Sequence, residues 1–160
     1  MKIAALIIPL IGSLALGSFF GCVRDSGYEP LRFERISKAE NLTFQANVDG
    51  TLFAGQWEYR FRIKQADRVS LLVEVLSDQP DLGVKLVRKG ILFDQNITCK
   101  EAITLQTPCK LEIKNPDRGE YSLVLQHGTE QESTVHYRIF AGVHGPGYAS
   151  VVWEEEIARR

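Results

Sequence analysis

Two runs of alternating apolar and polar residues between Trp57 and Leu76 constrain the fold most strongly. A period of two places the apolar members of each run on one face of a β-strand. We expect the two strands to form a hairpin around residues 65–68. Its apolar face needs a second layer to cover it. The apolar positions are Trp57, Tyr59, Phe61 and Ile63 in the first run, and Val69, Leu71, Val73 and Val75 in the second.

The same pattern recurs in short segments along the chain, separated by turn residues. Asp49-Gly50, Lys89-Gly90 and residues 115–119 have the composition of turns. No amphipathic helix longer than two turns is evident. We therefore predict an all-β fold, a two-sheet antiparallel β-sandwich of about eight strands that is jelly-roll-like. Further strands are expected near residues 42–48, 82–86, 102–105, 109–113, 121–125 and 135–141, and residues 91–93 follow a turn.

Residues 1–21 have the features of an export signal rather than of a folded segment. A short basic start precedes an uncharged stretch from Ile3 to Phe20, and charged residues follow at Arg24. Cleavage after Gly17 would release a secreted protein. An uncleaved segment would be a membrane anchor, although it is barely long enough to span a bilayer.

Gly21-Cys22 resembles the end of a bacterial lipobox, although Phe19 and Phe20 stand where that family usually has Leu and a small residue. The resemblance implies cleavage before Cys22 and acylation of that cysteine, which would anchor the chain to a membrane. Val23 is not the aspartate associated with inner-membrane retention, which favours the outer membrane.

Three cysteines leave one unpaired. Cys99 and Cys109 are near enough in sequence to form a disulfide, which would stabilise the fold by about 3 kcal/mol. Cys22 is then the unpaired residue, at the position that a lipid would occupy. The alternatives are that Cys22 belongs to a discarded signal, or that Cys99 and Cys109 are reduced core thiols.

Four segments follow from these features. We expect a signal peptide (1–21), a tether (22–40), a β-sandwich domain (41–143) and a C-terminal tail (144–160). Apolar residues at 31, 33 and 36 would allow part of the tether to dock on the domain. The stretch from Tyr148 to Trp153 is either a last strand or a free segment that adds to a partner's sheet.

The order of motifs in the domain resembles the bacterial pre-peptidase C-terminal domain. That resemblance implies a jelly-roll-like sandwich that accompanies secreted hydrolases or stands alone in the envelope. Some members bind calcium, but no ligand set can be carried over to this chain. The matching segments are Gly50-Thr51-Leu52, Tyr59 to Ile63, Val69 to Val75, Asp81 to Leu86 with Gly90, Gly119 to Leu125, and Tyr137 to Ile139.

Few residues form a recognisable catalytic or metal-binding pattern. The histidines at 127, 136 and 144 lack metal-ligand spacing. No nucleophile elbow, P-loop or dinucleotide motif occurs. Asp78 and Asp81 are the first place to look for a carboxylate pair or a calcium site, although aspartates also form loop turns. We therefore predict no enzyme activity, no metal and no cofactor.

Arg60, Arg62 and Lys64 alternate with the apolar residues of the central strand and form a row that we call the basic row. This row is a candidate binding face for an anionic glycan, a lipid headgroup or an acidic partner. Alternatively, its charges pair with neighbouring strands, for example with Glu74. Without Lys2 the chain has 18 basic and 20 acidic residues. This slightly negative net charge does not suggest nucleic-acid binding.

We therefore expect a lipid-anchored protein of the bacterial cell envelope whose sandwich is a non-catalytic protein-interaction or assembly module. Its partners would be a membrane, reached through Cys22, and an envelope protein. An exported glycan-binding module is the alternative. A small secreted hydrolase is a third hypothesis.

Overall fold

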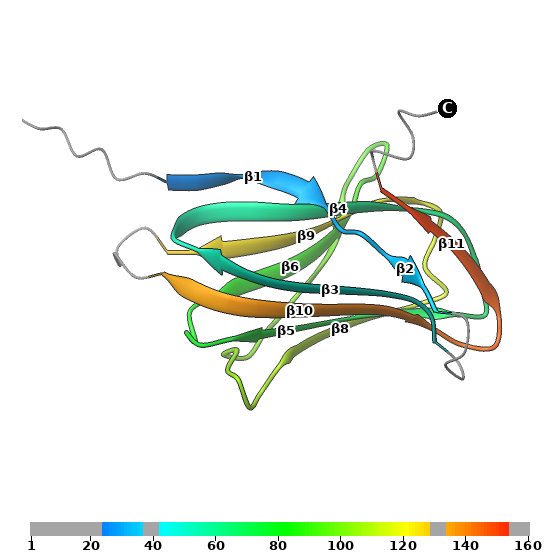
Figure 1. Ribbon diagram of the computed structural model, residues 1–160. Coiled ribbons are helices and arrows are strands. Elements are labelled where there is room, and N and C mark those ends of the chain that lie inside the picture. The colour runs from blue at the N-terminus through cyan, green and yellow to red at the C-terminus, as the bar shows by residue number, and fades with distance from the viewer. Residues whose placement is uncertain (1–23, 37–41, 129–133, 154–160) are drawn as a thin grey trace, which may run out of the picture.

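The computed structural model describes residues 24–36, 42–128 and 134–153, which form a sandwich of two stacked β-sheets (Figure 1). Among the described residues there is no helix that could cross a membrane. In chain order the strands are β1 (Arg24–Pro30), β2 (Glu34–Arg35), β3 (Leu42–Leu52), β4 (Ala54–Asp67), β5 (Ser70–Ser77), β6 (Gly83–Arg88), β7 (Gln95–Thr98), β8 (Cys109–Lys114), β9 (Gly119–His127), β10 (Val135–His144) and β11 (Tyr148–Val152).

The first sheet has the order β1-β4-β9-β6-β7, with β11 also paired to β4, and the second has the order β2-β3-β10-β5-β8. All pairs are antiparallel except β1 with β4, which are parallel. The predicted all-β, two-sheet sandwich is confirmed. It has more strands than expected because both ends of the described chain and the short β7 join the sheets.

The core lies between the inner faces of the two sheets. Tyr59, Phe61 and Ile63 on β4 are buried, as the alternation predicts, and so are all four apolar positions of the second run. Burying such a side chain contributes about 1.5–3 kcal/mol each. Aromatic contacts add to the packing, since the Phe61 ring centroid lies 5.1 Å from that of Phe33 and 5.4 Å from that of Tyr121, on which it stacks.

The predicted hairpin between the two central runs is wrong. β4 lies in the first sheet and β5 in the second, so the two strands do not pair. Arg68, at a φ of 53°, stands where the chain passes from one sheet to the other. The physical reason is that each run has its own apolar face. Placing the strands in opposite sheets lets these faces cover one another directly, whereas a hairpin would put both on the same side of one sheet and require other strands to cover them.

The predicted turn at Asp49-Gly50 is also wrong, because β3 continues through both residues. Gly50 lies opposite Tyr137 of β10. A Cβ atom at Gly50 would lie 2.6 Å from the Tyr137 hydroxyl. This hydroxyl forms a 2.7 Å hydrogen bond with the Tyr59 hydroxyl, which joins the two sheets inside the core. The glycine therefore makes room for an aromatic ring and does not mark a turn.

The segment expected as a tether joins the sandwich over residues 24–36. β1 pairs with the first half of β4, from Ala54 to Arg60. The carboxylate of Asp25 accepts a 2.8 Å hydrogen bond from the Phe53 amide. Leu31 and Phe33 are buried in the core. The sheets therefore include residues that precede position 41.

Residues 148–152, within the segment expected as a tail, form a strand of the sandwich rather than a free segment. β11 pairs antiparallel with the second half of β4, from Arg62 to Asp67. One edge of β4 is thus shared between β1 and β11, as Figure 1 shows.

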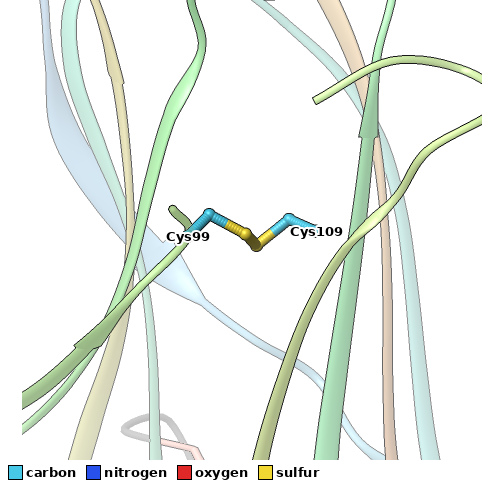
Figure 2. The surroundings of a disulfide bond; sticks show 2 residues. All are labelled: Cys99 and Cys109. Atoms are coloured by element: carbon cyan, nitrogen blue, oxygen red, sulfur yellow. A yellow bond between two sulfur atoms is a disulfide. The ribbon is translucent and has the colours of Figure 1, made fainter. Parts of the chain in front are cut away.

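The predicted disulfide between Cys99 and Cys109 is confirmed (Figure 2). Cys99 directly follows β7 of the first sheet, and Cys109 begins β8 of the second. The bond therefore connects the two sheets at one side of the sandwich. The strand expected at residues 102–105 is wrong. There the Thr104 hydroxyl accepts hydrogen bonds from the amides of Gln106 and Thr107, which forms a side-chain-stabilised turn.

Candidate functional site

The most exposed apolar side chains of the described residues gather in the loop between β6 and β7. We call residues 89–94 the tip loop. Ile91 is 103% exposed, Leu92 84% and Phe93 85%. Single exposed apolar residues are common on protein surfaces, but contiguous clusters mark sites of interaction. Because these side chains bury nothing within the described fold, the tip loop is our candidate functional site.

Polar contacts brace the tip loop from within. Asp94 accepts a 3.1 Å hydrogen bond from the Gly90 amide, and its other oxygen lies 3.4 Å from the Lys89 ammonium. The Gly90 amide, followed by the Lys89 charge, lowers the pKa of Asp94 below its ordinary value. The Lys89 amide in turn donates to the Glu120 carbonyl at 2.8 Å. The loop is therefore held at its base to β9.

Gly90 lets the chain turn back on itself. A Cβ atom at this position would lie 1.9 Å from the Phe93 carbonyl oxygen. Any other residue would force the backbone apart, so the compact shape of the loop depends on glycine here. The prediction of a tight turn at Lys89-Gly90 agrees with this geometry.

Cationic side chains surround the base of the tip loop. A hollow lies between the loop and the Arg118-Gly119 segment that leads into β9. Arg88 also lines it and forms a 3.0 Å ion pair with Asp117, and it donates to the Arg118 carbonyl at 3.3 Å. Among the described residues, no ion pair is formed by the exposed Arg118 side chain.

The basic row lies on the outer face of the first sheet, beside the tip loop. A pocket of about 360 Å³ is lined by Arg60, Arg62 and Lys89, among others. Two of the row's charges are neutralised within the sheet. Arg60 pairs with Glu58 at 3.1 Å, and Arg62 pairs with Glu120. Lys64 lines a separate hollow with Arg62 and Gln65.

The suggested pairing of the basic row with Glu74 is wrong. Glu74 lies in the other sheet, where its carboxylate is 2.8 Å from the Lys110 ammonium. Arg60 has a further contact on its own sheet, because its guanidinium stacks over the exposed Tyr28 ring at 3.7 Å. The row is thus a partly neutralised face rather than an uncompensated positive stripe.

The two aspartates singled out in the sequence serve separate structural roles. Asp78 accepts a 2.9 Å hydrogen bond from the His136 amide. Asp81 lies 3.1 Å from Nδ1 of His127, a histidine that is buried at the end of β9. His144 lies in β10 with its ring beside Phe140. Within the described ranges, no group of three metal-ligating side chains comes together.

Sequence reasoning did not identify the tip loop as a site. Its three apolar residues are too few to show a period, so the sequence indicates only that they follow a turn. The signal that could have revealed the loop is its frame. Lys89-Gly90 and Asp94 bracket the three residues with turn-forming chemistry. Cys22, the predicted lipidation site, lies outside the described residues.

The site is an apolar hairpin loop that projects from a two-sheet β-sandwich, and comparison with known proteins adds only distant structural likeness. No protein-family model and no curated protein matches the chain. Among solved structures, Aeromonas hydrophila PliG, a periplasmic lysozyme inhibitor of g-type lysozyme, matches 73% of this chain and 96% of its own, at 10% identity and a TM-score of 0.46. Salmonella Typhimurium PliG, of the same description, matches 74% and 99%, at 13% identity and a TM-score of 0.40. Likeness at this level assigns no function to the chain.

Proposed function

We propose that this chain is an exported β-sandwich of the bacterial cell envelope, anchored by a lipid at Cys22, and that it binds another protein without catalysing a reaction. The single observation that carries the binding role is the tip loop. Ile91, Leu92 and Phe93 are almost fully exposed and adjacent in the chain, whereas the other exposed large apolar side chains of the described residues are scattered and at most 62% exposed. Each exposed side chain offers about 1.5–3 kcal/mol if a partner covers it.

The bracing of the loop supports a binding role as well. A loop that is held in one shape loses less conformational freedom on binding, which increases affinity. Asp94 and Gly90 provide this restraint within the loop, and the Lys89 amide attaches it to β9. An exposed loop without such contacts would have to be ordered by the partner at an entropic cost.

The proposed anchor rests on the sequence at Gly21-Cys22 and on the cysteine count. Cys99 and Cys109 are joined to each other, which leaves Cys22 as the cysteine available for acylation. The glycan-binding alternative would need exposed aromatic rings on a sheet face. Tyr28 and Tyr148 are about half exposed on the two strands that pair with one edge of β4, and the Arg60 guanidinium stacks over the Tyr28 ring. The resemblance to the pre-peptidase C-terminal domain stays part of the proposal, as a description of the sandwich.

The anchor is tested by the intact mass of the protein from its own host, for wild type and Cys22→Ser. We expect a wild-type chain that begins at Cys22 and carries acyl chains, and an unacylated Cys22→Ser chain. An unmodified wild-type chain that begins at Ser18 would contradict the anchor.

The binding role is tested by a photo-crosslinking residue placed at position 92 in living cells. Leu105 is the matched control, because it is also exposed, at 62%, but lies in the loop between β7 and β8. We expect a discrete protein adduct from position 92 that position 105 does not give. Equal labelling from both positions would contradict a specific partner at the tip loop.

A further inference from the structure

The direction of the strands relates the tip loop to the start of the described chain. β1 is parallel to β4, and β4 and β6 are both antiparallel to β9. β1, β4 and β6 therefore run in the same direction. β1 begins two residues after Cys22 and runs away from it. β6 runs in the same direction and ends where the tip loop begins.

Register along the sheet gives the separation along the strands. Arg24 lies level with Ala54, and Arg88 lies level with Phe61 through their shared neighbour Tyr121. Seven positions along β4 correspond to about 23 Å at about 3.3 Å per residue. The tip loop follows Arg88, so its base lies about 23 Å along the strands from the start of β1, and β4 continues past Phe61 as far as Asp67. A single residue, Val23, separates Cys22 from β1.

We propose that the tip loop docks into an apolar pocket, rimmed by carboxylates, on a protein that it meets away from the surface of the anchoring membrane. This inference rests on the anchor at Cys22 proposed above. A lipid at Cys22 holds the start of β1 at the membrane, and only one residue of slack separates them. The base of the tip loop then lies about 23 Å along the strands from the end of β1 that the lipid holds.

Charges at the loop base define the rim of the receiving pocket. Arg88, Lys89 and Arg118 stand against Asp94 and Asp117, so the base carries one net positive charge. The first two cations have carboxylate partners in the chain. Arg118 is exposed beside the apolar tip, so it is the cation that a carboxylate of the partner would meet. The Ile, Leu and Phe side chains would occupy the pocket itself.

The first experiment asks whether the tip loop binds lipid instead. Cys22→Ser protein that lacks the proposed signal (residues 1–21) is mixed with vesicles of phosphatidylethanolamine and phosphatidylglycerol, and sedimentation measures binding. We expect no sedimentation above that of a Leu92→Ser, Cys22→Ser variant. Vesicle binding that the Leu92→Ser change abolishes would overturn the inference. Because this arm uses unanchored protein, its outcome does not depend on acylation.

The second experiment tests the chemistry of the partner through the adduct from position 92. Arg118→Glu should reduce the yield of the adduct about tenfold or more, and so should Phe93→Ser. Arg138→Glu is the matched control, since Arg138 is an exposed arginine on β10 of the other sheet. An adduct with lipid, or a protein adduct that Arg118→Glu leaves unchanged, would overturn the inference.

The third measurement places the loop relative to the membrane. An acylated Leu92→Cys variant carries a nitroxide at position 92 and is bound to the same vesicles, with acylated wild-type protein as the unlabelled control. The accessibility of the nitroxide to a water-soluble relaxant is compared with its accessibility to oxygen. We expect a water-exposed label. A label buried in lipid would overturn the inference even where the mass spectrum shows the anchor. A wild-type mass without acyl chains would refute the anchor and the proposed location of the loop. The vesicle and crosslinking experiments would still decide whether the tip loop binds a protein.

Discussion

Buried tyrosines should make this fold sensitive to alkali. Tyr59, Tyr121 and Tyr137 are each at most 4% exposed. Burial raises the pKa of all three above the ordinary value of 10.0, and for Tyr59 the hydrogen bond with Tyr137 raises it further. The unfolded chain, in contrast, releases these protons near pH 10. Above that pH the unfolded state therefore binds fewer protons than the folded state, and the free energy of unfolding falls as pH rises.

The size of the effect follows from proton linkage. One group that ionises only in the unfolded state removes about 1.4 kcal/mol of stability per pH unit above pH 10. Three such groups remove up to about 4 kcal/mol by pH 11. Domains of this size are stable by about 5–15 kcal/mol, so the loss is a large fraction of the total. Below pH 10 the three tyrosines contribute no slope to the stability curve, because they are protonated in both states.

Urea unfolding followed by circular dichroism, from pH 8 to pH 11, measures this slope. Tyr121→Phe should reduce the slope by up to one proton equivalent. It should also lower stability by about 1 kcal/mol at every pH, because the 2.7 Å hydrogen bond from the Tyr121 hydroxyl to the Asp117 carbonyl is lost. Tyr148→Phe, at a tyrosine that is 55% exposed, is the control and should leave the slope unchanged. Parallel curves for wild type and Tyr121→Phe would refute the reasoning.

Three further predictions concern the disulfide, the core and the tip loop. Replacing Cys99 and Cys109 together by Ala should lower the free energy of unfolding by about 3 kcal/mol, since the bond closes a loop of sequence separation 10. Urea titration measures this loss. A reductant should destabilise the wild type and have no effect on the variant. Gly50→Ala should cost about 1–3 kcal/mol because its Cβ displaces the Tyr137 ring, whereas Gly128→Ala, with nothing within 4 Å, should be nearly neutral in thermal unfolding. In NMR spectra the Gly90 amide resonance should shift as pH falls below 3.8. The reason is that Asp94, whose pKa is lowered, keeps its charge and its hydrogen bond above that pH. An amide resonance that shifts equally in Asp94→Asn would show that Asp94 does not hold the loop.

Alternation was sufficient to predict the strands and their buried faces. Tyr59, Phe61 and Ile63 are buried as their spacing predicted. The pairing of strands was not predictable in the same way, because a period of two says which face of a strand is buried and not which strand lies beside it. The residues after Lys64 therefore suggested a hairpin although the chain crosses between sheets there.

Turn composition was a less reliable guide than alternation. Asp49-Gly50 has the residues of a turn, yet Gly50 sits inside β3 because Tyr137 needs the space. That requirement comes from a residue far away in the sequence, so no local pattern contains it. Lys89-Gly90, in contrast, makes a turn through contacts within the same six residues. Local chemistry was readable from the sequence where the contacts themselves are local.

The candidate site also combines features that a local sequence pattern predicts with features that depend on distant contacts. The basic row was visible as a pattern, but its neutralisation by Glu58 and Glu120 depends on packing in the folded sheet. The exposure of Ile91, Leu92 and Phe93 was hidden, because composition alone suggests that such residues are buried. Only the arrangement of the surrounding strands reveals that nothing in the described fold covers them.

The parallel pairing of β1 with β4 has a mechanical consequence for a chain held at one end and bound at the other. A pull on the start of β1, opposed by a pull on the tip loop, acts along the strands of the first sheet. Such a load shears the β1–β4 hydrogen bonds together instead of opening them one after another from an end. The Asp25 contact with the Phe53 amide lies at the loaded end of the same strand. The arrangement is therefore suited to transmit tension through the domain without peeling its first strand away.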